Sequence, residues 1–286
     1  MTPAHRRSRD RGFAMIAVLV AVVALAGLAY DVVLQGRTNI VIAQAEVDRA
    51  RMEAAADAGL AMAEAELVGG GPRWPIDGTP RSPTFEGIQL TVAIEDERGK
   101  IPVNVLSDTE ARRLFEAAGA SGQQLATLTD SFLDWRDDDE ERRPNGAESA
   151  DYTRRGYRAR DGDITAIGEL ARINGMTPAI YARIVPYVTL FFGETGGFNE
   201  RTASPFAIRV MTGEDDQGPA SIERAREIRG QRTRLGFDDK ADAVLTGRRF
   251  TVRVTARDAR GGRLTRATIV EPTGDPRAPI WVRAAE

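Results

Sequence analysis

The chain has 286 residues, of which 42% are apolar and 28% are charged, a composition that supports a folded core and argues against a disordered chain, a collagen-like repeat and a multi-span membrane protein. Cysteine is absent and His5 is the only histidine, which excludes thiol catalysis and thiolate zinc sites and, once a leader containing His5 is removed, histidine-dependent catalysis and histidine-ligated metals. The formal net charge is −3, and because four arginines cluster in the first twelve residues, the remaining chain is more acidic and is a poor general binder of nucleic-acid backbone.

A basic leader, residues 1–12, opens the chain and ends in Gly12. The segment 13–30 that follows carries no charge, and as a helix it would be about 27 Å long, enough to cross a bilayer core. Because the arginines precede this segment and Asp31 follows it, the positive-inside rule predicts a cytoplasmic N-terminus and an exported bulk.

We expect the helix to continue beyond the apolar segment. Residues 40–68 are rich in alanine, glutamate, methionine and leucine, contain no proline, and place apolar residues on roughly one stripe. The glycines and proline of 69–72 then end the helix, so the sequence predicts one helix over 13–68, about 80 Å long. A cleaved secretory signal is the alternative; the length of the apolar run and the unbroken helical sequence count against it.

A basic leader ending in glycine, followed by phenylalanine and an apolar helix that becomes amphipathic, resembles the class III signal of type IV pilins and type II secretion pseudopilins. The resemblance implies that a prepilin peptidase cleaves between Gly12 and Phe13 and that Phe13 becomes an N-methylated first residue. Family members usually carry glutamate as the fifth mature residue, where this chain has Ala17. Lack of this glutamate is characteristic of the K-type minor pseudopilin, which the resemblance places at the tip of the pseudopilus.

Alternating apolar and polar residues predict strands at 85–97, 250–257 and 264–271, with a turn at 258–262 and an edge strand at 280–282. These strands can form one antiparallel sheet packed on the N-terminal helix. The expected fold class is therefore α+β, with pilin-like architecture.

A long, mostly helical stretch interrupts the sheet and is large enough to be an inserted all-α domain. In its first helix Ser107 and Glu110 form a capping-box pattern, and a segment around Ser204 weakly repeats it. Two short helices around Asn174-Gly175 resemble a sterile-alpha-motif or helix-hairpin-helix unit. Helix-hairpin-helix units often bind DNA phosphates, but few bases lie near this hairpin and we expect packing or protein contact, with no nucleic-acid partner.

The expected organisation has six parts. They are the leader 1–12, the transmembrane half of the helix 13–36, its soluble half 37–71, the first part of the sheet 72–100, the insert 101–245, and the remainder of the sheet 246–286.

The insert contains an acidic motif, D-W-x-D-x-D at 134–139, followed by R-P-N-G-A-E at 143–148 and D-Y at 151–152. It resembles the K-type pseudopilin strongly. Such closely spaced carboxylates repel one another unless neutralised, and Ca²⁺ prefers oxygen ligands. A solvated loop screened by neighbouring arginines is the alternative, and the spacing does not match an EF-hand. The resemblance favours a structural Ca²⁺ held by Asp134, Asp137, Asp139, Glu148 and Asp151, with Asn145 as a further candidate.

The resemblance implies a minor pseudopilin of the type II secretion system that has no catalytic activity and caps the pseudopilus tip with I-type and J-type partners to support export across the outer membrane. The chain would be a single-pass inner-membrane protein with a periplasmic bulk, and the insert would contact the secretin or the cargo. The alternatives are a minor pilin of a type IV pilus or DNA-uptake system, a membrane-anchored helix-hairpin-helix DNA-binding protein, and an anchored enzyme in which Asp137 and Asp139 use a metal-activated water.

Overall fold

The computed structural model describes residues 7–69, 74–193, 197–213 and 245–285. His5, the first six residues of the expected leader, part of the 69–72 helix stop and the 214–244 part of the expected insert lie outside the described residues. The chain divides into two compact units, Met1–Ala54 and Ala55–Glu286.

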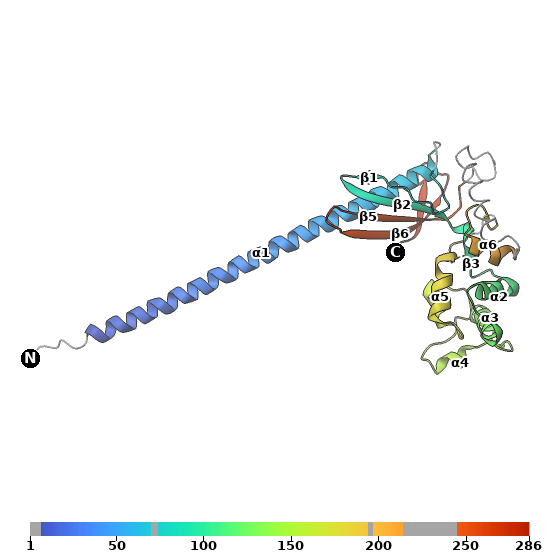
Figure 1. Ribbon diagram of the computed structural model, residues 1–286, viewed down its shortest axis with the longest axis horizontal. Helices are drawn as coiled ribbons and strands as arrows, with labels where there is room; N and C mark the ends of the chain where they lie inside the picture. The colour runs from blue at the N-terminus through green and yellow to red at the C-terminus, as the bar shows by residue number, and fades with distance from the viewer. Residues whose placement is uncertain (1–6, 70–73, 194–196, 214–244, 286) are drawn as a thin grey trace, which may run out of the picture. The chain divides into compact units, whose positions relative to one another are not determined.

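Helix α1 (Arg7–Val68) is continuous over 62 residues (Figure 1). It confirms the expected long helix but begins within the leader, where no proline or other strong helix breaker separates Arg7 from the apolar segment. Of the described helices, this one alone is long and apolar enough to cross a membrane. Between Phe13 and Val47, the large apolar side chains that the structure describes are exposed, which suits lipid or the faces of other helices.

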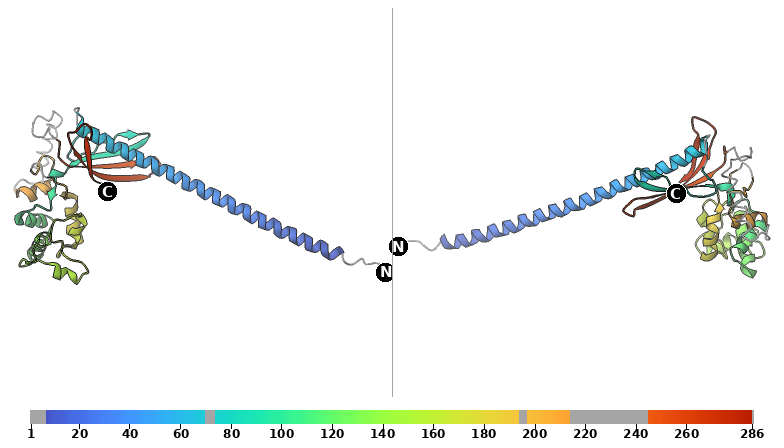
Figure 2. Two further views of the ribbon diagram at one scale, coloured as in Figure 1. Left: turned by 180° about the vertical axis from the view of Figure 1, so that it is seen from behind. Right: turned by 45° about the horizontal axis from the view of Figure 1, so that its top comes forward.

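An antiparallel sheet has the strand order β1-β2-β5-β6-β7. The strands are β1 (Thr84–Phe85), β2 (Ile88–Asp96), β5 (Phe250–Arg257), β6 (Arg263–Pro272) and β7 (Ile280–Ala285). The last turns of α1 lie beside this sheet (Figures 1 and 2). A Cβ at Gly59 of α1 would lie 2.7 Å from Val254 Cγ1, so the helix approaches β5 closely. The expected α+β fold is confirmed, and β7 is longer than expected.

We call the described residues between β2 and β5 the helical insert. Its helices are α2 (Asp108–Ala117), α3 (Gly122–Arg136), α4 (Ser149–Thr153), η2 (Ile167–Arg172), α5 (Pro178–Ile184), η3 (Val185–Tyr187) and α6 (Pro205–Thr212). A short parallel pair, β3 (Ile101–Pro102) and β4 (Val188–Thr189), and the turn η1 (Glu97–Gly99) complete it. One apolar core, which includes Phe115, Phe132, Trp135 and Tyr152, unites these elements.

The expected capping box is present at α2. Ser107 Oγ accepts from Glu110 N at 3.3 Å, and Glu110 Oε2 accepts from Ser107 N at 2.8 Å. The helix expected before Asn174 is instead the six-residue 3₁₀ helix η2. Glu169 binds the backbone N–H groups that precede η2, and the turn at Gly175 follows soon after it, so too few residues remain for a longer α-helix.

A buried ion pair joins the sheet to the helical insert at the end of β2. Asp96 is 3% exposed and pairs with Arg248, which is also 3% exposed. The same carboxylate accepts hydrogen bonds from Asn199 Nδ2 at 2.8 Å and Thr202 Oγ1 at 3.2 Å. Two separate parts of the insert, one with Asn199 and Thr202 and the other with Arg248, therefore meet the carboxylate of Asp96 at the end of β2.

A second carboxylate continues this connection. Glu97 accepts hydrogen bonds from the hydroxyls of Thr189 in β4 and Thr251 in β5, and Lys100 Nζ lies 2.7 Å from its Oε1. Because buried charges are stable only when they are paired and hydrogen-bonded, these contacts hold the sheet and the insert in one arrangement.

Candidate metal centre

The acidic loop after α3 is held against that helix by two aspartates one turn apart. Asp130 Oδ2 accepts from Asn145 N at 3.0 Å and from Asn145 Nδ2 at 2.9 Å. Asp134, with a fully buried side chain, accepts from Arg143 N at 3.3 Å and forms an ion pair with its guanidinium. A Cβ at Gly146 would lie 1.8 Å from Asp134 Oδ2, so only glycine permits this close approach.

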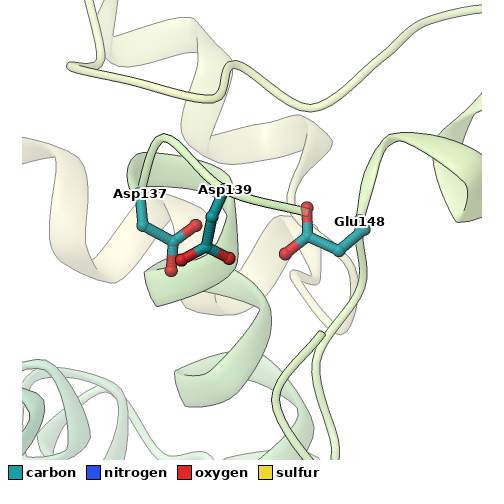
Figure 3. Close-up of side chains that lie close together, drawn as sticks. All are labelled: Asp137, Asp139 and Glu148. Atoms are coloured by element: carbon teal, nitrogen blue, oxygen red, sulfur yellow. The ribbon is translucent and has the colours of Figure 1, made fainter. Parts of the chain in front are cut away.

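This arrangement brings three carboxylates of the loop together. Asp137, Asp139 and Glu148 each offer an oxygen, and these oxygens lie within 4.8 Å of one another (Figure 3). Glu148 is only 4% exposed, yet neither of its carboxylate oxygens has a hydrogen-bond donor in the described structure. Oδ1 of Asp137 is buried without a donor as well. Buried carboxylates without donors are strongly unfavourable unless a positive group compensates them.

The raised pKa values of the cluster show that its negative charges are also unfavourable. Burial raises the pKa of Glu148 to about 7, with smaller contributions from Asp134 and Asp137. Burial also raises the pKa of Asp134 to about 6, against the opposing effect of hydrogen bonding to Arg143. The pKa of Asp137 is raised by burial and then by the charge of Asp139. Mutual repulsion of this kind is relieved by a cation.

The donor set suits a hard divalent cation. All three groups are carboxylates, the ligands that Ca²⁺ and Mg²⁺ prefer, and the loop has no sulfur or imidazole that would favour zinc. Ca²⁺ takes six to eight oxygens in flexible geometry. Three carboxylates leave room for backbone carbonyls and water, so the residues present fit calcium.

Two of the five expected ligands have other partners. Asp134 holds the loop on α3 as described above. Asp151 accepts from Glu148 N at 3.2 Å and lies 3.7 Å from both Arg142 and Arg154. The structure therefore brings Asp137, Asp139 and Glu148 together. Binding of Ca²⁺ by any of the five ligands expected from the sequence stays a prediction.

The sequence did not identify Asp161 as a contributor to the carboxylate cluster. The charge of Asp161 raises the pKa of both Asp137 and Glu148, so it acts on the same cluster. Its Oδ2 accepts from Ser149 Oγ at 3.2 Å, and its φ of 51° places it in the left-handed region. The only sequence signal is its position before glycine in a turn, and such turns are common without a ligand.

Aromatic side chains form the wall behind the loop. Trp135 and Tyr152 meet edge to face with ring centroids 5.0 Å apart, and Tyr157 stacks on Tyr152 at 5.5 Å. Each of the motif's D-W and D-Y pairs thus supplies an aromatic residue to the core and a carboxylate that organises the loop. This explains why the two residue types are adjacent in the motif.

The expected processing site lies in α1. Phe13 is 75% exposed and Ala17 is exposed on the same helix. Cleavage after Gly12 and methylation of Phe13 stay predictions.

Residues 92–193, which include the whole acidic loop, match the family model described as type II secretion system protein K. The chain is similar to the type II secretion system protein K family over this segment. This similarity confirms the family resemblance inferred from the acidic motif, whereas the leader lies outside the matched residues.

Two curated members of the protein K family show the extent of the similarity. Type II secretion system protein K of Dickeya chrysanthemi is 29% identical over 131 residues, which are 46% of this chain and 36% of that protein. Its counterpart in Klebsiella pneumoniae is 33% identical over 113 residues, 39% of this chain and 34% of that protein. The matches therefore span about a third of the length of each relative.

The fold extends the similarity beyond the aligned sequence. A chain in the crystal structure of the GspK-GspI-GspJ complex from the enterotoxigenic Escherichia coli Type 2 Secretion System matches with a TM-score of 0.56 and 15% identity, over 88% of this chain and 98% of that chain. At this identity the match shows a similar fold over most of both chains.

Proposed function

We propose that the chain is a minor pseudopilin of the type II secretion system, without catalytic activity, that caps the pseudopilus tip together with I-type and J-type minor pseudopilins. In this role it supports export of proteins across the outer membrane. The insert would meet the secretin or the cargo.

The position of the insert carries this proposal. Asp96 at the end of β2 pairs with Phe250 at the start of β5, so the chain leaves the sheet and returns to it at one end. The C-terminal end of α1 lies at that same end, because Trp74 N donates to Glu66 of α1 and Asp96 N donates to Ile76 O. The insert therefore adds bulk where α1 ends, which is where a further subunit would have to stack.

The residues of α1 support the same role. A carboxylate in the bilayer is costly unless it meets a partner, and a tip subunit has no neighbour above it to provide one. Ala17 in place of glutamate fits that position. We propose that the apolar part of α1 anchors the free subunit in the inner membrane, with the N-terminus cytoplasmic and the second unit periplasmic, before a prepilin peptidase cleaves after Gly12.

The hairpin around Gly175 favours packing over DNA binding. A Cβ at Gly175 would lie 3.3 Å from Leu128 N, so the turn packs on α3. Asn174 N donates to Tyr152 Oη at 3.0 Å and Met176 N donates to Ile173 O at 3.1 Å. Phosphate binding by such hairpins needs free backbone amides, and these two are engaged.

We propose Ca²⁺ as the ion held by Asp137, Asp139 and Glu148, with Asp134 and Asp151 positioning the loop. A bound ion would supply the positive charge that the buried carboxylates lack and would stabilise the insert by binding only the folded state.

Intact mass and N-terminal sequencing of the membrane-extracted chain, with and without a prepilin peptidase in the producing cell, test the pathway. We expect a start at Phe13 that requires the peptidase. Co-purification of the full chain with the I-type and J-type subunits of the same system tests the assembly. A retained Met1, or no complex with either subunit, would contradict the proposed function.

A further inference from the structure

The hairpin formed by β5 and β6 is rich in arginine. It carries Arg253, Arg257, Arg260, Arg263 and Arg266. Arg253 lies 3.7 Å from Glu95, and Arg266 pairs with Asp57 of α1. Arg257 and Arg263 are exposed, and neither forms an ion pair within the described ranges.

These two arginines are directly opposite each other in the register of the hairpin. Val254 of β5 faces α1, as its proximity to Gly59 shows, and strand side chains alternate between faces. Arg257, three residues on, therefore lies on the outer face of the sheet, and its cross-strand partner Arg263 lies on that face with it. Like charges directly opposite in a sheet repel and destabilise it.

The turn between the two strands leaves this positive charge largely uncompensated. A hollow of about 690 Å³ lies beside the two arginines, and among the residues that the structure describes Asp258 is the one carboxylate that lines it. Its Oδ1 accepts from the backbone N–H groups of Arg260 at 2.9 Å and Gly262 at 2.7 Å. That carboxylate is therefore committed to holding the turn.

The outer face beyond Arg257 and Arg263 carries mostly short side chains. By register and alternation these are Thr91, Ala93, Thr255, Thr265 and Ala267. Arg253, which lies 3.7 Å from Glu95, stands on the same face between Ala93 and Ala267. A polypeptide segment can lie close to this outer face over several residues. A lipid headgroup would contact only Arg257 and Arg263 and would leave the rest of the outer face uncovered.

We propose that the outer face of the sheet docks an acidic segment of a neighbouring pseudopilus subunit, whose carboxylates bind Arg257 and Arg263. The inference rests on the proposed function. A guanidinium binds a carboxylate with two parallel hydrogen bonds, and a partner carboxylate between the opposed arginines converts their repulsion into attraction. The arrangement is unfavourable in the free chain and favourable in the complex.

The test uses the full chain co-expressed with the I-type and J-type subunits of the same system. Arg263→Glu places a carboxylate opposite Arg257, so we expect the melting temperature of the free chain to rise by about 1–3 °C. The same change should weaken the complex at least about tenfold, because one charge-assisted contact is lost and a like charge is introduced. Arg277→Glu, an exposed arginine in the β6–β7 connection, is the matched control and should change neither quantity appreciably.

The outcomes separate the inference from the function on which it rests. If the unaltered chain forms no complex, the proposed function fails. If the complex forms but Arg257→Glu and Arg263→Glu leave its yield unchanged, the docking inference is wrong and the proposed function stands. If Arg263→Glu instead releases the chain only from anionic-lipid nanodiscs, the hollow binds lipid phosphate and the inference is again wrong. Restoration of the Arg263→Glu complex by an acid-to-arginine change in the partner would support it.

Discussion

Gly59 of α1 lies so close to Val254 of β5 that a methyl group at position 59 would come within 2.7 Å of the valine Cγ1. Helical glycine is normally improved by alanine, which would add up to about 1 kcal/mol of helix propensity. Here the opposing side chain is branched and packed in the sheet, and cannot move aside cheaply.

We therefore predict that Gly59→Ala lowers the free energy of unfolding of the second unit by about 1–3 kcal/mol. Thermal or denaturant unfolding of the full chain in detergent measures the change. Gly168→Ala is the control, since nothing lies within 4 Å of a Cβ there. Equal effects of the two substitutions would mean that α1 does not approach β5 as described.

The carboxylate of Glu148 should lower the free energy of unfolding when no metal is bound and raise it when Ca²⁺ is bound. Glu148→Gln removes a buried charge that has no donor, so at pH 8 in chelator we expect it to raise the free energy of unfolding by on the order of 2 kcal/mol. In Ca²⁺ the unaltered chain should gain stability and the variant should gain much less. Asp138→Asn, in the same loop but outside the cluster, should preserve the calcium response. An unaltered chain that melts identically in Ca²⁺ and in chelator, after verified metal removal, would refute the calcium proposal.

The raised pKa of Glu148 also predicts a pH dependence for the metal-free chain. Its pKa rises from 4.5 to about 7 on folding, so between these values the unfolded chain loses its proton first. The stability contribution of the neutral carboxyl is thus present below about pH 4.5 and is lost as the pH rises toward 7. Asp134, with a pKa of about 6, acts in the same direction. Denaturant unfolding in chelator at several pH values should show this decline, and Glu148→Gln should flatten it. A decline of equal slope in the variant would assign it to other groups.

The buried pair of Asp96 and Arg248 should be sensitive to removal of one partner. Arg248→Met leaves the carboxylate of Asp96 buried with the Asn199 and Thr202 side chains, the Arg98 backbone N–H and the more distant Arg98 guanidinium, whose Nε lies 4.0 Å from Asp96 Oδ1. We expect a loss of about 3–5 kcal/mol in the free energy of unfolding. The double variant Asp96→Asn with Arg248→Met should recover part of that loss. If the double variant is as unstable as the sum of the single changes, the two groups do not interact as described.

Local patterns in the sequence predicted much of the fold. Period-two alternation located β2, β5 and β6, and the Ser107–Glu110 spacing located the start of α2, because each signal is contained within one element. The two-residue strands β3 and β4 escaped prediction, since their pairing joins Ile101 to Val188 and depends on the whole insert.

The candidate site was predictable only in part for the same reason. The acidic motif named Asp137, Asp139 and Glu148 because they are near one another in sequence. That Asp134 and Asp151 take other partners depends on the packing of the loop against α3, where Gly146 allows the backbone to approach. The contribution of Asp161 depends on a turn from elsewhere in the insert, and no local spacing connects it to the motif.

The position of the insert also governs the order in which the chain can fold. Glu97, which directly follows β2, and Thr251 in β5 are separated by 154 residues, yet their side chains meet. During synthesis β2 must wait for the entire insert to emerge before β5, its main hydrogen-bonding neighbour, arrives, and closing so long a loop slows formation of the sheet. Until then the apolar strand is an open edge that can pair with other chains. Early folding of the insert would shorten the effective loop, so a variant in which the insert folds more slowly should aggregate during folding even if its final stability is unchanged.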